Sequence, residues 1–281
     1  MNLIDINDIN APEMDIFARA TERQLRTNEA FGNGLFMAES AYVAIRALEA
    51  GYIPVSILVE RERLEIEAAP VFEAIEMHCG SEMLVNIPVY IADREVVINM
   101  IGHHLVRGLW TLFRRKSAVS LEEFCKDKKR IAVLMDVVNP ANIGAIFRSA
   151  AALGMDGVLL THSSVDPLTR RSARASMGTV FQIPWVQASL QESDGLNLMD
   201  FLRSKGYKTV AMALTEDSTS VDNDEIRSNE KIAVFLGTEG TGLPEAVIAA
   251  SDYRVMIPMY RGVDSLNVAA ASAISFWELM K

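Results

Sequence analysis

Three short stretches of the chain combine residues that could bind a ligand or carry chemistry. The stretch "NPANIGAIFR" holds Asn142 and Arg148, "LGTEGTGL" holds Glu239 among glycines, and "VDSLNVAAA" holds Ser265 and Asn267. A serine could be a nucleophile, an asparagine could cap a helix, and a glycine turn allows a ligand to approach the backbone. Each interpretation is open on its own, so the elements around the stretches have to decide.

Several common catalytic motifs are absent from the sequence. There is no G-x-x-x-x-G-K-[ST] phosphate loop, no G-x-G-x-x-G after a strand and no G-x-S-x-G nucleophile elbow. No histidine follows Ser265, which leaves a serine hydrolase as the least favoured alternative. Cys79 and Cys125 are isolated, so they predict neither a disulfide framework nor a zinc site. We expect no metal, because the histidines also lack ligand spacing: His78, His103, His104 and His162.

Composition limits the class of protein. The chain has 281 residues, 50% of them hydrophobic, and a net charge of −10. These values are typical of a globular protein, and the length favours two domains. The negative charge argues against a generic nucleic-acid coat protein, which would bind through overall basicity. The absence of a long apolar run, of a basic leader and of paired cysteines favours a cytoplasmic protein without a membrane span.

Charge is distributed unevenly along the chain. Residues 214–230 are acidic, whereas residues 105–130 are basic. Either run alone is most simply a solvated segment, although the basic one could face RNA phosphates. The cations of the basic run are Arg107, Arg114, Arg115, Lys116, Lys126, Lys128, Lys129 and Arg130.

The first part of the chain alternates strands and helices. We predict an amphipathic helix over residues 12–28, and a strand and a helix over "GLFMAESAYVAIRALEAG". Further strands are predicted at "IPVSILVE", "VNIPVYIA" and "GLWTLFRR". This alternation indicates a small three-layer α/β domain over residues 1–116. The charged stretch that follows predicts a linker over residues 117–129.

The second part, residues 130–281, predicts a parallel sheet covered by helices on both faces. "IAVLMDVV", "DGVLLT", "KTVAMAL", "KIAVFLG" and "YRVMIP" are apolar runs of the kind that buried parallel strands have. Asn139 or Asn142 could cap the helix that begins near Pro140. The three polar stretches follow predicted strands, at the sheet edge where open α/β sheets bind ligands. Because the glycine loop has no Lys, a backbone-held adenosine fits it better than a triphosphate.

Together, "NIGAIFR", "FLGTEGTGL" and "IPMYRGVDSLNVAAA" resemble, in order and spacing, the three signature motifs of the SpoU-type (TrmH-like) RNA 2′-O-ribose methyltransferases of the SPOUT superfamily. The resemblance covers residues 130–281, and "RRSARASMGTVFQIPW" looks like the family segment between the first two motifs. The first part is similar to the L30e-like RNA-binding domain of many members.

The resemblance implies a fold and an activity. The fold would be an α/β domain with a deep trefoil knot, preceded by the L30e-like domain. The activity would be methyl transfer from S-adenosylmethionine to a ribose 2′-hydroxyl of structured RNA, with ribosomal RNA favoured over transfer RNA. A homodimer through the knotted domain is also implied, because each site in the family is completed across the subunit interface.

The resemblance also assigns roles to residues. Arg148 would be the central catalytic residue, assisted by Asn142, Glu239, Ser265 and Asn267. Since arginine keeps its proton in proteins, we expect Arg148 to position and polarise rather than act as a base. Further RNA contacts are expected from Arg170, Arg171 and Arg174. The implied cofactor-binding residues are Leu236, Gly237, Thr238, Gly242, Ile257, Pro258, Ser265, Leu266 and Asn267.

Two alternatives within the superfamily stay open. The chain could be a catalytically inactive knotted protein that binds RNA or assists ribosome assembly, or a SPOUT enzyme that methylates a base. The presence of all five implied catalytic residues argues against the inactive protein. Thr238 stands where the family often has Asn, which leaves the role of this position undefined.

Overall fold

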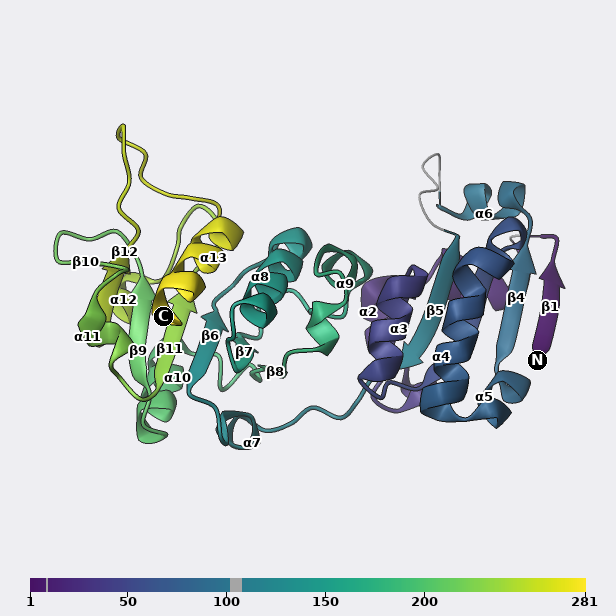
Figure 1. Cartoon of the computed structure of the whole chain (residues 1–281), viewed down its shortest axis with the longest axis horizontal. Helices are drawn as coiled ribbons and strands as arrows, with labels where there is room; N and C mark the ends of the chain where they lie inside the picture. Colours follow the sequence, from purple (N-terminus) through teal and green to yellow (C-terminus); the bar gives the residue numbers. More distant parts are fainter. Residues whose placement is uncertain (9, 102–107) are drawn as a thin grey trace. The chain divides into compact units, whose positions relative to one another are not determined.

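The structure is a computed structural model that describes residues 1–8, 10–101 and 108–281. The chain forms two compact units (Figure 1). The first consists of Met1–Ser117 and Leu168–Phe181, and the second of Ala118–Pro167 and Gln182–Lys281. Three residues considered from the sequence, Arg107, His103 and His104, lie outside the described residues.

The first unit contains a five-stranded sheet in the order β1-β4-β3-β5-β2 among its described residues. Strands β1, β4 and β3 are parallel, and β5 pairs antiparallel with both β3 and β2. Strand β1 is an addition to the strands predicted from the sequence. The strand bounds are β1 Asn2–Ile6, β2 Leu35–Glu39, β3 Pro54–Glu60, β4 Pro88–Ala92 and β5 Leu109–Arg114.

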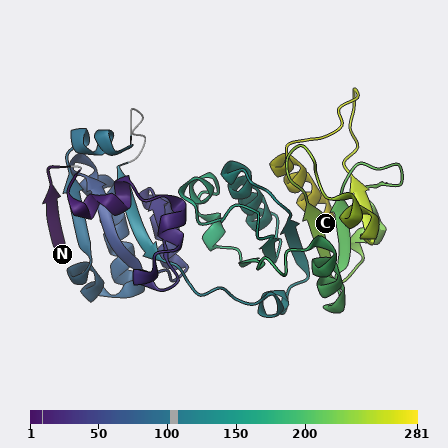
Figure 2. The same ribbon diagram turned by 180° about the vertical axis from the view of Figure 1, so that it is seen from behind.

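Helices cover both faces of this sheet, as Figures 1 and 2 show. On one face Met37 and Leu112 pack with Met14 and Phe17 of the N-terminal helical segments. The other face carries α3 and α4. The helix bounds are α1 Asp15–Ala18, α2 Glu22–Arg26, α3 Ala41–Glu49, α4 Ala69–Cys79, α5 Ser81–Asn86, α6 Arg94–Ile101 and α9 Arg170–Ala175, with short turns at Pro12–Met14, Glu29–Phe31, Arg61–Arg63, Leu64–Ala68 and Thr179–Phe181.

The prediction of one helix over residues 12–28 is wrong. The chain leaves helix α1 at Arg19 and begins α2 at Glu22. Thr21 caps α2, with its hydroxyl accepting from the Gln24 amide and the Gln24 side chain accepting from the Thr21 amide. This capping box stabilises a new helix start at the position where a continuous helix was expected.

The segment Leu168–Phe181 packs within the first unit, although the sequence analysis assigned it to residues 130–281. Arg170 donates to Glu22 at 2.8 Å, and Arg174 donates to Glu39 at 2.7 Å. The ring of Phe181 lies 5.5 Å from that of Phe36 between centroids. Two ion pairs and an aromatic contact therefore hold this segment on the first unit.

The second unit contains a seven-stranded sheet in the order β10-β12-β9-β11-β6-β7-β8, with every pair parallel. The predicted parallel sheet is confirmed, and its central strands β6, β7 and β11 are almost entirely buried. The strand bounds are β6 Arg130–Leu134, β7 Gly157–Leu160, β8 Trp185–Gln187, β9 Lys208–Met212, β10 Thr219–Ser220, β11 Ile232–Leu236 and β12 Tyr253–Met256.

The helices of the second unit include one inside the expected linker. Helix α7 buries Leu121, Phe124 and Cys125 in the same core as Tyr207, so residues 121–125 are part of the fold. Helices α8 and α13 pack against each other. The helix bounds are α7 Leu121–Cys125, α8 Pro140–Ala152, α10 Gly195–Ser204, α11 Asp224–Arg227, α12 Glu245–Ala250 and α13 Val268–Leu279.

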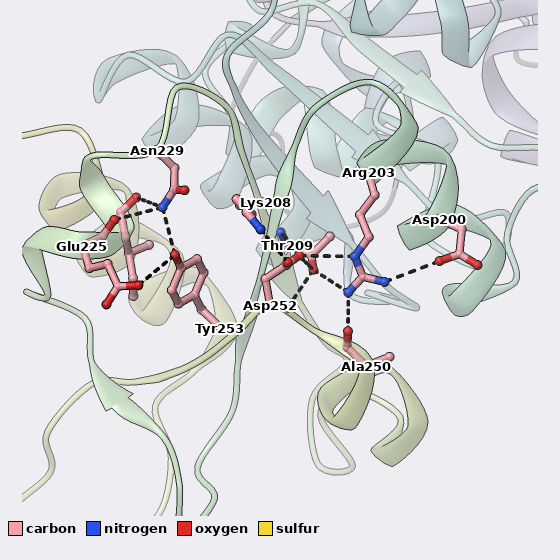
Figure 3. A network of polar contacts seen from close by, with 10 residues as sticks. Asp200, Arg203, Lys208, Thr209, Glu225, Asn229, Ala250, Asp252 and Tyr253 are labelled. Atoms are coloured by element: carbon pink, nitrogen blue, oxygen red, sulfur yellow. Dashed lines mark hydrogen bonds and ion pairs between the residues drawn. The ribbon is translucent and has the colours of Figure 1, made fainter.

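A polar network around Asp252 ties β9 to the segment between α12 and β12 (Figure 3). One carboxylate oxygen of Asp252 accepts from the Thr209 amide at 3.0 Å, the Thr209 hydroxyl at 2.7 Å and the Arg203 side chain at 3.3 Å. The other oxygen accepts from Lys208 at 3.2 Å. Burial raises the pKa of Asp252, but these donors outweigh it and lower the pKa to about 2.

Candidate functional site

A cavity of about 390 Å³ lies in the second unit, where β9, β11 and β12 end. Its walls come from the segments that follow these three strands and from the start of α13. The lining residues are Met212, Ala213, Leu214, Leu236, Gly237, Thr238, Glu239, Gly240, Gly242, Val255, Met256, Ile257, Met259, Asp264, Ser265, Leu266, Asn267, Val268 and Ala271.

The glycine loop after β11 folds back onto its own start. The Gly242 amide donates to the Thr238 carbonyl at 3.1 Å, and these two residues form an isolated bridge. A Cβ atom on Gly237 would lie 2.2 Å from the carbonyl carbon of Gly242 and 2.4 Å from the Leu243 nitrogen. Since both neighbours are backbone atoms, only glycine fits at position 237. Gly237, Gly240 and Gly242 all line the cavity, so the loop presents backbone there.

The third stretch starts α13 and contacts the first stretch. The side-chain oxygen of Asn267 accepts from the Ala269 amide at 2.9 Å, which confirms the predicted helix cap. Its side-chain nitrogen donates to Asn142 at 3.3 Å. Asn142 is 8% exposed, and its own amide nitrogen has no hydrogen-bond partner among the described residues. The cap of α8 itself is Asn139. One asparagine therefore both begins α13 and links it to α8.

Most predicted cofactor residues do line the cavity, but Pro258 does not. Of the implied catalytic residues, Glu239, Ser265 and Asn267 line it, whereas Asn142 reaches it only through Asn267. Sequence reasoning missed the wall formed by Met212–Leu214 at the end of β9. The apolar strand was recognisable, but nothing in the sequence says that β9 is the neighbour of β11 in the sheet.

Comparison with known proteins identifies the family. Residues 129–277 match the model of the SpoU rRNA Methylase family. The chain belongs to this family. An uncharacterized tRNA/rRNA methyltransferase of Mycobacterium bovis is 33% identical over 279 residues, 99% of this chain and 92% of the relative. The 23S rRNA (guanosine(2553)-2′-O)-methyltransferase of Bacillus subtilis is 30% identical over 158 residues, 56% of this chain and 60% of the relative.

Solved structures share the fold of this chain. An AdoMet-bound rRNA methyltransferase from Sinorhizobium meliloti has a TM-score of 0.79 at 23% identity, covering 99% of this chain and 97% of that one. An RNA 2′-O ribose methyltransferase has a TM-score of 0.74 at 24% identity, covering 99% and 98%. These likenesses confirm the expected α/β fold of the knotted SPOUT type. This chain is therefore an RNA methyltransferase of the SpoU type.

Arg148, the central residue implied by the SpoU motifs, lies apart from the cavity. It occupies α8 and is exposed, and its side chain forms no hydrogen bond or ion pair with other described residues. It follows Asn142 by six positions, so the two side chains leave the helix about 120° apart. Within one chain, Arg148 is thus not held by the residues that were expected to fix it.

The three arginines expected to contact RNA lie on α9 in the first unit. Arg170 and Arg174 are engaged by Glu22 and Glu39. Arg171 is exposed and forms no ion pair within the described part of the chain. The first two arginines therefore hold the segment in place, which leaves Arg171 as the better candidate for a phosphate contact.

The described residues contain no helix that is long and apolar enough to cross a membrane. They also contain no group of three or more His, Cys, Asp or Glu side chains that could hold a metal ion.

Proposed function

We propose that this chain transfers a methyl group from S-adenosylmethionine to a ribose 2′-hydroxyl of RNA, with ribosomal RNA favoured over transfer RNA. The observation that carries the proposal is the cavity in which the glycine loop and the start of α13 meet, with Asn267 linked to Asn142. The Bacillus subtilis relative and one solved neighbour are named as ribose 2′-O-methyltransferases.

The cavity suits the cofactor in size and in charge. Its volume of about 390 Å³ falls within the range of small-molecule sites, about 300–1,000 Å³. The lining includes the carboxylates of Glu239 and Asp264 and, among the described residues that form it, no Lys, Arg or His. Such walls favour a cationic ligand and disfavour a triphosphate. When bound, S-adenosylmethionine supplies the methyl group of its sulfonium.

Backbone groups would hold most of the cofactor. Gly237, Ile257 and Leu266 line the cavity and would offer their main chain to the cofactor, with Leu236, Thr238 and Gly242 beside them. Pro258 would act only by directing this backbone, since its side chain does not line the wall. Ser265 and Asn267 would fix the loop at the start of α13. Glu239 would add negative charge near the sulfonium.

In the homodimer expected for the family, Arg148 would act at the active site of the partner subunit. Helix α13 exposes apolar side chains at Ala270, Ile274 and Trp277, which share one face by their spacing of four and three residues. Ile274 is 37% and Trp277 57% exposed. We propose that a second copy covers this face, next to α8, and that Arg148 serves the partner's cavity. Light scattering of Trp277→Glu should then report a monomer, against a dimer for the unchanged chain.

Arg148 would clamp a phosphate of the RNA and polarise the attacking hydroxyl. Its guanidinium keeps its proton, so a positive charge near the 2′-oxygen would lower the pKa of that hydroxyl and favour its deprotonation. Holding the oxygen in line with the methyl carbon lowers the barrier further. We expect Arg148→Ala to reduce turnover by at least about 100-fold while S-adenosylmethionine affinity is unchanged. Near-normal turnover with unchanged RNA binding would contradict the role.

A methylation assay separates this function from its two alternatives. The protein is incubated with labelled S-adenosylmethionine and unmodified 23S or transfer RNA, and the digested nucleosides are analysed by mass spectrometry. Methyl on the ribose supports the proposal, whereas methyl on a base identifies a base methyltransferase. No incorporation, together with no heat on titration with millimolar S-adenosylmethionine, would identify an inactive RNA-binding protein.

A further inference from the structure

The loop between β12 and α13 is both a wall of the cavity and a projection beyond it. Ile257 and Met259 line the cavity before the tip, and Asp264 to Asn267 line it after the tip. Residues 260–263 form the tip and do not line it. Figure 1 shows this loop as a trace that extends past the ends of the strands. Whatever approaches the cavity along this side must pass the tip.

The tip presents an aromatic ring and a cation to the outside. Tyr260 is 83% exposed, and Val263 is 51% exposed. Arg261 is also exposed, and no other described residue forms a hydrogen bond or an ion pair with its side chain. The Val263 amide donates to the Tyr260 carbonyl at 3.3 Å, and Arg261 has a φ of 61° within this turn. A non-glycine residue in that region carries a backbone cost, which is common at functional sites.

An unstacked nucleobase matches this combination better than a protein surface does. Single-stranded RNA is recognised by stacking of bases on aromatic side chains and by arginine contacts to phosphate. A ribose that delivers its 2′-hydroxyl into the cavity must be drawn out of a regular helix together with its neighbours. The base next to the target then lies at the rim, where Tyr260 is located.

We propose that Tyr260 stacks on a base adjacent to the methylated nucleotide and that Arg261 contacts the phosphate between them. This proposal rests on the proposed function, because it assigns the tip to the substrate of the same cavity. Tyr260 is a positioning residue here, since it does not touch the reacting atoms. Stacking also tolerates any base, so the tip would orient the strand rather than read its sequence.

The test combines three variants with a control. Tyr260→Ala should raise the KM for unmodified 23S rRNA by about 5- to 100-fold, the range expected for losing one stacked base. Tyr260→Phe keeps the ring and should stay within about 2-fold of the unchanged protein. Arg261→Ala should lower the slope of log affinity against log salt by about 1. The control Leu190→Ala removes a side chain that is 69% exposed and outside the cavity lining.

Two further measurements test the role of the tip independently of the methyltransferase activity. Affinity for a fluorescent mixed-sequence single-stranded RNA does not require turnover, so it tests Tyr260 even if no methyl transfer is found. Calorimetric titration of S-adenosylmethionine should give the same affinity for Tyr260→Ala as for the unchanged protein. The proposal is overturned by unchanged RNA affinity and KM in Tyr260→Ala, by an equal loss in Leu190→Ala, by a matching loss of cofactor affinity, or by a change of oligomeric state in Tyr260→Ala.

Discussion

The carboxylate of Asp252 allows a quantitative test of what joins β9 to β12 (Figure 3). Burial raises its pKa, but donors from Thr209, Lys208 and Arg203 lower the pKa from the usual 3.8 to about 2. The Asp252 side chain is only 19% exposed, so solvent screening removes little of this effect. One pKa unit corresponds to about 1.4 kcal/mol, which gives the ionised carboxylate about 2 kcal/mol of stabilisation at neutral pH.

We therefore expect Asp252→Asn to lower the free energy of unfolding of the second unit by about 2 kcal/mol at pH 7. The pKa of Asp252 is lower in the folded than in the unfolded chain. The stabilisation is consequently complete above about pH 5 and is lost as pH falls through 4 toward 2. The difference between the unchanged protein and the variant should decline to about half by pH 3. This difference in unfolding free energy can be measured for the second unit alone by urea unfolding, with hydrogen exchange of peptides from β9 and β12 as the readout.

Asp200 supplies a matched control for the Asp252 experiment. It pairs with the same Arg203 at 3.4 Å, but its side chain is 77% exposed. Asp200→Asn should change the free energy of unfolding by less than about 0.5 kcal/mol, because exposed ion pairs contribute little. Equal losses in the two variants, or a difference for Asp252→Asn that stays constant from pH 7 to pH 3, would refute the assigned electrostatics.

Four other variants test the glycine loop, the α13 cap and the α9 contact. Gly237→Ala should abolish S-adenosylmethionine binding in calorimetry, because its Cβ would overlap backbone atoms. The Cβ of Gly240→Ala would meet open space, so this variant should lower the free energy of unfolding by only about 1 kcal/mol, owing to its φ of 91°. Asn267→Ala should lower stability by about 1 kcal/mol through loss of the cap and should weaken cofactor binding, measured by melting and calorimetry. Arg174→Ala should speed hydrogen exchange across residues 168–181, with under about 1 kcal/mol of global loss, because its pair with Glu39 is half exposed.

The sheet of the second unit could be predicted because buried parallel strands are long apolar runs. Strands β8 and β10 have three and two residues, too few for any periodicity to appear. Helix α7 was missed for a different reason. Its buried Phe124 and Leu121 stand among charged residues, so composition favoured a linker although the fold buries them. The Thr21–Gln24 capping box, in contrast, was visible in the sequence and should have divided the N-terminal helix.

The individual loops of the site could be predicted from the sequence, but the cavity that they form together could not. Helix caps and glycine turns are local, so Asn267 and the loop after β11 followed from their neighbours in sequence. The order of strands in the sheet is a global property, and it alone brings the segment after β9 into the wall. The same holds for α9, where Arg170 and Arg174 have their carboxylate partners on distant elements of the first unit.

The spacing of Asn142 and Arg148 has a physical meaning that the sequence pattern leaves open. Six positions on one helix place the two side chains about 120° apart. Asn142 is buried and bonded to Asn267, 125 residues further along, so this side of α8 fastens the start of α13. Arg148 is exposed and engages no other described residue, so that side of α8 is directed outward. One rigid helix can thus stabilise its own cavity and offer a fixed cation to a molecule outside the chain. A shorter spacing of three or four residues would put both side chains on one face and would give up one of these two functions.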